Sequence, residues 1–331
     1  MSRLVLVTGA AGFIGSNICA DLAQAGWDVA ACDRLGPAED GKWRNLAKHP
    51  LADFTAPGAM WDWLSAHADE LDAVVHMGAV SATTEPDADL ILHTNFTLSR
   101  DLFRWCAEHG KPLVYASSAA TYGEGEGGFA DADDLKSLQA LRPLNAYGWS
   151  KALFDQYARR EADRGRAPPQ WAGLKFFNVY GPNEAHKGAM RSVVHQLYPK
   201  VAAGEEVRLF QSHREGIEDG GQRRDFVHVR DASAVVAWLL DHPQVSGIFN
   251  LGTGEARSFR DLAHAVFAAA GREPRIGYIP TPELIRDKYQ YFTQADMGRL
   301  RAAGYAAPFT PLEEGVADYV GRFLSQADPY R

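Results

Sequence analysis

Tyr147 and Lys151 are two side chains whose types and spacing could do acid–base chemistry. On a helix, residues four positions apart lie on one face, one turn from each other. An unperturbed tyrosine titrates near 10, roughly three pH units too high for a general base at neutral pH. Because a neighbouring cation stabilises a phenolate, Lys151 is predicted to lower the pKa of Tyr147 and make it a base.

Hydroxyl side chains gather in a second segment, Tyr115-Ala116-Ser117-Ser118-Ala119-Ala120-Thr121-Tyr122-Gly123. It begins within a short apolar run that is predicted to be a strand. Ligands of open α/β sheets bind at the carboxyl ends of strands, so these hydroxyls are expected beside a bound molecule. Ser118 is predicted to bind the substrate and to share a hydrogen bond with the alcohol that Tyr147 deprotonates.

A glycine-rich turn follows the first predicted strand, with Gly9, Gly12 and Gly15 three residues apart. Gly9 permits a tight turn, Gly12 lets the backbone approach a pyrophosphate at the amino end of a helix, and Gly15 allows close packing of helix and strand. The turn therefore predicts a bound dinucleotide. Its predicted contacts are Gly9, Ala11, Gly12, Phe13, Ile14 and Gly15.

Asp33 stands at the end of the second predicted strand, 18 residues after Gly15. An acid in this position can accept hydrogen bonds from the adenosine ribose, which favours NAD. Arg34 and Lys42 follow, and cations there can hold the 2′-phosphate of NADP. Asp33, Arg34 and Lys42 are thus predicted cofactor contacts, and the residue types alone leave both dinucleotides open.

The elements that position these residues alternate along the first half of the chain. Short apolar runs predict buried strands over 4–7, 29–32, 73–76, 113–116 and 174–177. Longer segments between them predict helices over 12–25, 57–68, 87–109 and 145–163. This alternation is typical of an α/β fold with a doubly wound parallel sheet. Tyr147 and Lys151 then lie on a helix beside the strand that carries Ser118.

Beyond residue 181 the alternation loosens, which predicts a second, smaller lobe. Its expected elements are a helix near 190–203, a strand over 207–210 and a helix over 258–270. Strands expected over 224–229 and 248–251 return the chain to the first unit. The dinucleotide-binding domain is predicted to comprise 1–181 plus about 224–255, and the substrate domain about 182–223 plus 256–331. The glycine-rich segment 123–143 is expected to be a mobile surface insertion without chemistry.

The composition is that of a globular protein able to bury a large core, with 46% of its 331 residues hydrophobic. A net charge of -8 disfavours nucleic acid and anionic membranes as partners. The three cysteines and the histidines lack ligand-like spacing, so buried thiols in a reducing compartment and no metal are expected. No signal peptide or bilayer-spanning run is recognisable, and a cytoplasmic protein is expected.

The glycine turn, the Ser-Ser strand end and the Tyr-Lys helix, in this order, resemble the extended short-chain dehydrogenase/reductase family over essentially the whole chain. The resemblance implies a Rossmann-type cofactor domain, a carboxy-terminal nucleotide-sugar lobe, and a catalytic set of Ser118, Tyr147 and Lys151. It also implies that Tyr147 and Lys151 contact the cofactor, and that the cofactor is NADP. Further cofactor contacts in this resemblance are Met77, Gly78, Ala79, Ser81 and Asn95.

Three later segments, 175–188, 222–226 and 287–296, are similar to the ADP-heptose 6-epimerases within that family. The similarity implies ADP-heptose as the substrate, Lys187 as a second acid/base group and a homo-oligomer such as a pentamer. One base cannot easily serve both faces of a ketone, so Tyr147 and Lys187 are expected on opposite sides of it. The substrate contacts implied are Ser118, Asn178, Val179, Lys187, Phe210, Arg224 and Tyr289.

Other proteins share parts of this pattern. A 4-epimerase needs the same tyrosine but no second base, so Lys187 argues against it. A 4,6-dehydratase needs an acidic pair after the strand-end serine, where Ala119 and Ala120 are inert. A protein that senses the dinucleotide without turnover would not need an intact catalytic set.

Three positions depart from the usual pattern of the family. Met77 stands where an acid near the cofactor is common, and Ala189 stands where a polar residue is frequent. His195 lies outside the usual placement of a histidine. These departures concern sugar contacts and the grip on the cofactor, and they leave the catalytic positions unchanged.

Overall fold

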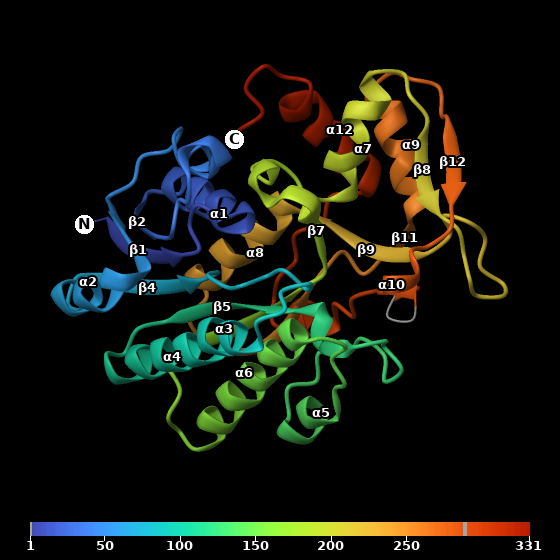
Figure 1. Ribbon diagram of the computed structural model, residues 1–331. Helices are drawn as coiled ribbons and strands as arrows, with labels where there is room; N and C mark the ends of the chain where they lie inside the picture. Colours follow the sequence, from blue (N-terminus) through green and yellow to red (C-terminus); the bar gives the residue numbers. More distant parts are fainter. Residues whose placement is uncertain (1, 287–289) are drawn as a thin grey trace.

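A seven-stranded parallel sheet forms the centre of the protein (Figure 1). The computed structural model describes residues 2–286 and 290–331. The strands stand in the order β10-β6-β5-β4-β1-β2-β3. The chain adds strands outward from β1 through β2 to β3, and then crosses back to add β4 on the other side of β1. They are β1 (Arg3–Thr8), β2 (Trp27–Cys32), β3 (Asp53–Thr55), β4 (Leu71–His76), β5 (Leu113–Ser118), β6 (Trp171–Phe176) and β10 (Gly247–Leu251). The predicted Rossmann-type, doubly wound α/β fold is confirmed.

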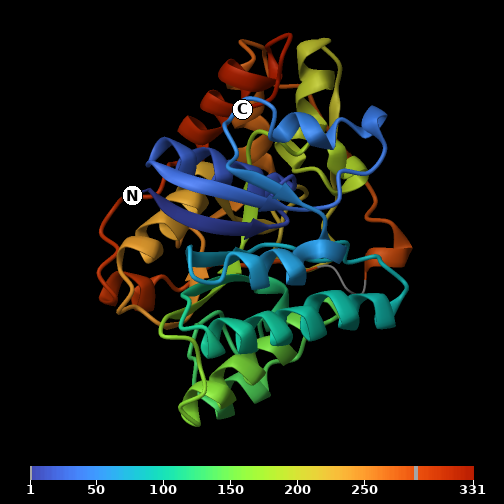
Figure 2. The same ribbon diagram turned by 90° about the vertical axis from the view of Figure 1, so that its left-hand side faces the viewer.

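Helices cover both faces of this sheet, as Figures 1 and 2 show. One face is covered by α1 (Phe13–Gln24), α8 (Val229–Asp241) and α11 (Gly298–Ala302). The other is covered by α2 (Met60–Ala66), α4 (Leu98–Glu108) and α6 (Ala146–Asp163). Because both faces are buried, the strands are apolar on both sides, which is why short continuous apolar runs predicted them.

The helix predicted over 87–109 is confirmed, with one irregular turn inside it. The segments α3 (Ala88–Leu92), a π turn over His93–Thr97 and α4 follow one another without a break. Asp87 caps the amino end, where its carboxylate accepts a hydrogen bond from the Leu90 amide (2.9 Å). The π turn contains the fully buried Asn95, so an interruption of the regular helix coincides with a predicted cofactor contact.

A smaller lobe is built on two short sheets, with strand orders β11-β9-β7 and β12-β8. Their strands are β7 (Asn178–Tyr180), β8 (Val207–Phe210), β9 (Arg223–His228), β11 (Ala256–Ser258) and β12 (Ile276–Ile279). The accompanying helices are α7 (Val193–Ala202), α9 (Phe259–Ala269), α10 (Glu283–Arg286) and α12 (Leu312–Tyr319). An apolar cluster of its own joins α7, α9 and α12 to β8. No helix in the described part of the chain is long and apolar enough to cross a membrane.

One strand expectation is corrected. The strand predicted over 224–229 exists as β9, but it pairs with β7 and β11 in the smaller sheet and does not return to the large one. Only β10 returns, beside β6. The buried carboxylate of Asp225, near the start of β9, accepts a hydrogen bond from the Thr253 amide (2.7 Å), so β9 is held beside the loop that follows β10 and not within the large sheet.

The segment 123–143 is bound to the body of the protein and is not the surface insertion that its composition predicted. Asp131 is buried, and its carboxylate accepts a hydrogen bond from the Asn250 amide on β10 (2.7 Å). Asp133 pairs with Arg299 on α11 (2.7 Å). A short helix, α5 (Leu135–Ala140), follows. Two of the acidic residues that suggested solvent exposure, Asp131 and Asp133, bind inward, while Glu124, Glu126 and Asp134 are exposed.

The three cysteines are free, buried thiols, as predicted. Cys19 lies on α1, Cys32 ends β2 and Cys106 lies on α4. Burial raises the pKa of Cys32 to about 12, so that thiol stays protonated and unreactive at neutral pH.

Candidate active site

The glycine turn joins the end of β1 to the start of α1 with the close contacts that its spacing predicts. Gly9 has a φ of 66°, and a Cβ there would meet the Gly78 amide nitrogen at 2.7 Å. A Cβ at Gly15 would lie 2.1 Å from the Gly9 carbonyl oxygen. Gly12 is the N-cap of α1, and no side chain caps that end. The turn is therefore a backbone cradle at a helix amino terminus, where a pyrophosphate can bind.

Asp33, the residue after β2, is already engaged by protein donors. Its carboxylate accepts hydrogen bonds from the Ala11 amide (2.9 Å) and the Arg34 amide (2.6 Å). Lys42 forms an ion pair with it at 2.7 Å and also donates to the Arg34 carbonyl (2.6 Å). The negative charge of Asp33 is thus compensated by Lys42, while the Arg34 side chain is exposed beside the pair.

The loop after β4 borders the same turn. The Met77 amide donates to the Thr8 carbonyl (3.1 Å), and the Gly78 amide donates to the Thr8 hydroxyl (3.1 Å). Ala79 is half-buried and Ser81 is exposed. These contacts hold the backbone of the loop against the cradle.

Asn95 contacts the protein rather than pointing freely toward a ligand. Its side-chain oxygen accepts from the Val80 amide (2.8 Å), and its nitrogen donates to the Val80 carbonyl (2.9 Å) and to the Ser150 hydroxyl (3.1 Å). Ser150 in turn donates to the Tyr147 carbonyl (2.7 Å). Asn95 therefore joins the loop after β4 to helix α6. Any effect of Asn95 on a bound cofactor would act through that loop.

Ser118, Tyr147 and Lys151 come together at the carboxyl end of β5, as predicted. Tyr147 and Ser118 share a side-chain hydrogen bond, and the Lys151 ammonium donates to the Ala116 carbonyl (2.8 Å). Close approach of α6 makes this possible, because a Cβ on Gly148 would lie 2.6 Å from the Ala120 carbonyl oxygen.

Burial sets the protonation of this group. It raises the pKa of Tyr147, against the opposing effect of the Ser118 hydrogen bond. It lowers the pKa of Lys151 to about 8, against the opposing charge of Asp155. The prediction that Lys151 lowers the pKa of Tyr147 is therefore not met by the protein groups alone, because desolvation of the phenolate is the larger effect.

Lys187 lies on the glycine-turn side of the site. Its ammonium is 5.2 Å from the centre of the Phe13 ring, at the first residue of α1. Burial lowers the pKa of Lys187, against the opposing charge of Glu184. Glu184 is itself buried and bonded to the Ser192 hydroxyl (2.5 Å) and the Tyr319 hydroxyl (3.1 Å). The segment that carries Lys187 is therefore fixed at its base, while the lysine faces the cofactor cradle.

The predicted substrate contacts from the later segments lie in the smaller lobe. Asn178 is exposed on β7 and Phe210 ends β8. Val179 is half-buried on β7. Arg224 is buried against the Phe259 ring (5.6 Å) and donates to the Gln290 carbonyl. Tyr289 lies outside the described residues.

Several residues that organise the site were missed by sequence reasoning. Asp155 lies two helical turns after Tyr147, a spacing that could have revealed it. Asp225 accepts hydrogen bonds from the Thr253, Gly254 and Ala295 amides. Asn183 has a φ of 73° and donates to the Ser16 hydroxyl (3.0 Å). Only the folded chain shows these long-range partners.

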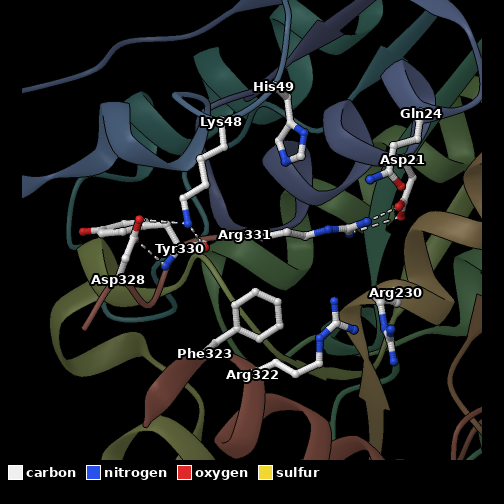
Figure 3. Close-up of a pocket in the computed structure, with 10 residues that line it drawn as sticks. All are labelled: Asp21, Gln24, Lys48, His49, Arg230, Arg322, Phe323, Asp328, Tyr330 and Arg331. Carbon is white, nitrogen blue, oxygen red and sulfur yellow. Dashed lines mark hydrogen bonds and ion pairs between the residues drawn. The ribbon is translucent and has the colours of Figure 1, made fainter. Parts of the chain in front are cut away.

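A separate cavity of about 550 Å³ lies between Asp21 and Gln24 of α1 and the last residues of the chain, Asp328, Tyr330 and Arg331 (Figure 3). Its cations are paired within the protein, for example Arg331 with Asp21 and Lys48 with Asp328. It does not contain the residues predicted to do chemistry. No metal-ligand cluster of three or more His, Cys, Asp or Glu side chains exists among the described residues.

The arrangement of cradle, strand end and helix matches known proteins. The sequence pattern of the NAD dependent epimerase/dehydratase family matches residues 5–252. The chain belongs to this family. A curated family member from Nitratidesulfovibrio vulgaris, named ADP-L-glycero-D-manno-heptose-6-epimerase, is 50% identical over 99% of this chain and 100% of its own length. One with the same name from Fusobacterium nucleatum is 43% identical over 99% and 100%.

Solved structures of the epimerase/dehydratase family share the whole fold. The ADP-L-glycero-D-manno-heptose-6-epimerase of Helicobacter pylori superposes with a TM-score of 0.80 at 27% identity, covering 97% of this chain and 96% of its own. The UDP-glucose 4-epimerase of Thermus thermophilus, solved in complex with NAD, has a TM-score of 0.74 at 30% identity, with 95% and 97% covered. Enzymes of different sugar specificity therefore use this scaffold.

Proposed function

We propose that the chain is a nucleotide-sugar epimerase that inverts C6 of the heptose in ADP-D-glycero-D-manno-heptose to give the L-glycero-D-manno product. The observation that carries the proposal is the 50% identity, over 99% of this chain, to the Nitratidesulfovibrio vulgaris enzyme named for that activity. The Ser118, Tyr147 and Lys151 side chains, which meet at the carboxyl end of β5, support turnover rather than mere binding.

The first half of the reaction removes the C6 hydroxyl proton and the C6 hydride, which leaves a ketone. Tyr147 takes the proton, and the Ser118 hydroxyl bonds the same oxygen, since the two side chains already share a hydrogen bond. Lys151, protonated below a pKa of about 8, supplies positive charge at the end of β5.

The ketone then turns over in the site, so that the second half of the reaction returns a hydride to the opposite face of C6 and a proton to the oxygen. Lys187 donates that proton, because it approaches from the glycine-turn side while Tyr147 approaches from α6. Its lowered pKa makes the ammonium a better acid than an exposed lysine. Two acid/base groups on separate elements then serve the two faces of one ketone.

The backbone cradle fits a dinucleotide, since side chains at Gly9 and Gly15 would collide with its walls. Gly9, Ala11, Gly12, Phe13, Ile14 and Gly15 would hold the pyrophosphate, and Lys151 the nicotinamide ribose. When bound, the dinucleotide supplies a temporary acceptor for the hydride and a positive charge that opposes the burial of Tyr147.

The dinucleotide in this proposal is NADP. The Lys42 ammonium compensates the Asp33 carboxylate at 2.7 Å, so Asp33 repels a 2′-phosphate less than a bare acid would. Arg34 is exposed beside it and can pair with that phosphate. Mass spectrometry of the dinucleotide released on denaturation distinguishes NADP from NAD.

Three further parts of the proposal concern the whole chain. Residues 1–181 plus about 224–255 bind the dinucleotide, and about 182–223 plus 256–331 bind the nucleotide sugar. The protein acts in the cytoplasm as a homo-oligomer. Light scattering on the purified protein measures the oligomer directly.

The direct test follows the configuration at C6 by NMR after the protein is mixed with ADP-D-glycero-D-manno-heptose, with UDP-glucose as a parallel substrate. We expect conversion of the heptose alone. Conversion of UDP-glucose alone would favour a 4-epimerase. If both sugars stay unchanged, a dinucleotide-sensing protein becomes the better account.

A further inference from the structure

Asp155 and Lys175 form an ion pair that is almost completely removed from solvent. The side chain of Asp155 on α6 is 0% exposed, and that of Lys175 on β6 is 1% exposed. Their charged atoms are 3.4 Å apart. Burying such a pair removes the strong hydration of two charges, and the attraction between them only partly offsets that cost. A buried ion pair is therefore weak evidence for a gain in folding stability. Its partners therefore decide what it does.

Asp155 binds the underside of strand β5. Its carboxylate accepts hydrogen bonds from the Ser117 hydroxyl (2.7 Å) and the Tyr115 hydroxyl (3.2 Å). Ser117 is the neighbour of Ser118, and its backbone is paired in register with Lys175 across β5 and β6. The acid thereby ties helix α6 to the last residues of the strand that presents Ser118.

Lys175 binds the turn that follows β5. Its ammonium donates to the Thr121 hydroxyl (2.8 Å), and that hydroxyl donates to the Ser118 carbonyl (2.8 Å). The ammonium also lies 4.6 Å from the centre of the Tyr122 ring. The cation thus holds the turn from below, on the side opposite the Ser118 hydroxyl.

On α6 the acid continues the spacing of the catalytic residues. Tyr147, Lys151 and Asp155 recur every four residues and share one face. The charge of Asp155 is the main influence that opposes the lowering of the Lys151 pKa by burial. The ion pair is therefore linked to Ser118 through β5 and to Lys151 through α6.

We propose that Asp155 and Lys175 are positioning residues for the reaction: their buried ion pair fixes the end of β5 against α6, and so holds Ser118, Tyr147 and Lys151 in one arrangement. The proposal rests on the proposed epimerase function. Neither residue faces the substrate, so both act through the hydroxyls, the strand and the helix that they hold.

Other charged or titratable groups lie around the pair and around Lys151. They come from β4, β5, α6 and the segments after β5 and β12. They are His76, Tyr115, Tyr122, Asp131, Asp133, Tyr147, Lys151 and Asp296. None of them replaces the contact of Asp155 with Lys175, because that pair alone joins α6 to β6 by opposite charges within 4 Å among the described residues.

The test uses Asp155→Asn, Lys175→Met and the double variant in the full chain, with Asp163→Asn as the matched control. Asp163 lies on the same helix in an exposed pair with Arg159. The readouts are the Tm, the dependence of kcat on pH, and the titration of Lys151 by NMR of carbon-labelled lysine. That titration needs no turnover, so it separates this proposal from the proposed function.

Lys175→Met leaves a buried carboxylate unpaired, and we expect a loss of Tm on the order of 10 °C. The double variant should recover most of that loss. Asp155→Asn should lower the pKa of Lys151 by about one unit and move the alkaline limit of kcat with it, in the single and the double variant alike.

The control variant should match the wild type in every readout. A double variant with wild-type kcat and an unshifted alkaline limit would show a purely structural pair and overturn the proposal. An unchanged Lys151 titration in Asp155→Asn would overturn it too, even if the wild type turned over no sugar.

Discussion

At the scale of single residues, burial controls the acid–base groups of the site. It raises the pKa of Tyr147 and lowers the pKa values of Lys151 and Lys187. Each shift favours the uncharged form, which makes the Lys151 and Lys187 ammonium groups better acids but keeps Tyr147 protonated, so its role as a base depends on the positive charge that a bound dinucleotide would supply. The reaction is therefore expected to be sensitive to substitution of the individual side chains of Tyr147, Lys151 and Lys187.

Lys187→Met removes the second acid/base group and preserves the apolar stem beside Phe13. We expect epimerisation to fall about 10²- to 10⁴-fold, with the bound dinucleotide retained. NMR turnover and the ultraviolet absorbance of the purified protein measure the two effects. Tyr147→Phe should lose turnover in the same way, and exposed Lys200→Met should lose nothing. Wild-type turnover in Lys187→Met would contradict the two-base mechanism.

Lys42→Met removes the cation that pairs with Asp33. The Asp33 carboxylate, left without its ion-pair partner, should then repel a 2′-phosphate, and the affinity for NADP should fall roughly tenfold or more while that for NAD changes little. Calorimetric titration of protein stripped of its dinucleotide checks this. Lys136 on α5 is an exposed lysine for the matched change to Met. Equal losses for both dinucleotides would count against the assignment of NADP.

At the scale of elements, the site depends on how closely α6 approaches the turn after β5. The sequence pattern predicted both elements, because apolar periodicity and the four-residue spacing are local properties. It did not predict the partners of Asp131 and Asp225. The partner of Asp131 lies more than a hundred residues away in the sequence, and those of Asp225 lie about 28 to 70 residues away. Long-range hydrogen bonds leave no periodic trace, and so the segment 123–143 and the strand β9 were misplaced.

Gly148→Ala tests that approach, because the new methyl group would lie 2.6 Å from the Ala120 carbonyl oxygen. The helix must shift to accommodate it. We expect kcat to fall by roughly a factor of ten or more, with a small loss of Tm. Gly321→Ala is the control, since nothing lies within 4 Å of a Cβ there. Equal kinetics in the two variants would mean that this contact does not position Tyr147.

At the scale of the whole molecule, polar contacts join the carboxy-terminal helix α12 to segments that lie far from it in the sequence. Tyr319 on α12 donates to Glu184 (3.1 Å), and Asp318 pairs with Arg230 on α8 (3.4 Å). His228 is fully buried 3.8 Å from Asp318. The family pattern in the sequence predicted the overall fold and brought Ser118, Tyr147 and Lys151 together, whereas these contacts between distant segments emerge only from folding.

Buried histidines should make the protein sensitive to acid. Burial lowers the pKa of His76 to about 3 and that of His228 to about 4. In the unfolded chain both histidines titrate near 6.5. Between pH 6.5 and the lowered pKa values the unfolded state therefore binds more protons than the folded state, and the free energy of unfolding decreases as the pH is lowered. His76 alone should remove about 2 to 3 kcal/mol of unfolding free energy by about pH 4.5.

Urea unfolding at several pH values measures that loss. His76→Gln cannot take up this proton, so its stability should decline less steeply below about pH 6.5. His264 on α9 is exposed and serves for the matched change to Gln. An identical slope in wild type and His76→Gln would show that His76 does not account for the acid sensitivity.

The central claim is that the hydrogen at C6 leaves and returns as a hydride beside the phenol of Tyr147. One bound dinucleotide would accept that hydride and give it back. Epimerisation in deuterated water, followed by NMR of the product, tests this most directly. We predict that C6 retains its original hydrogen, since a hydride does not exchange with solvent. Deuterium at C6 of the inverted sugar would show proton abstraction from carbon and would contradict the account.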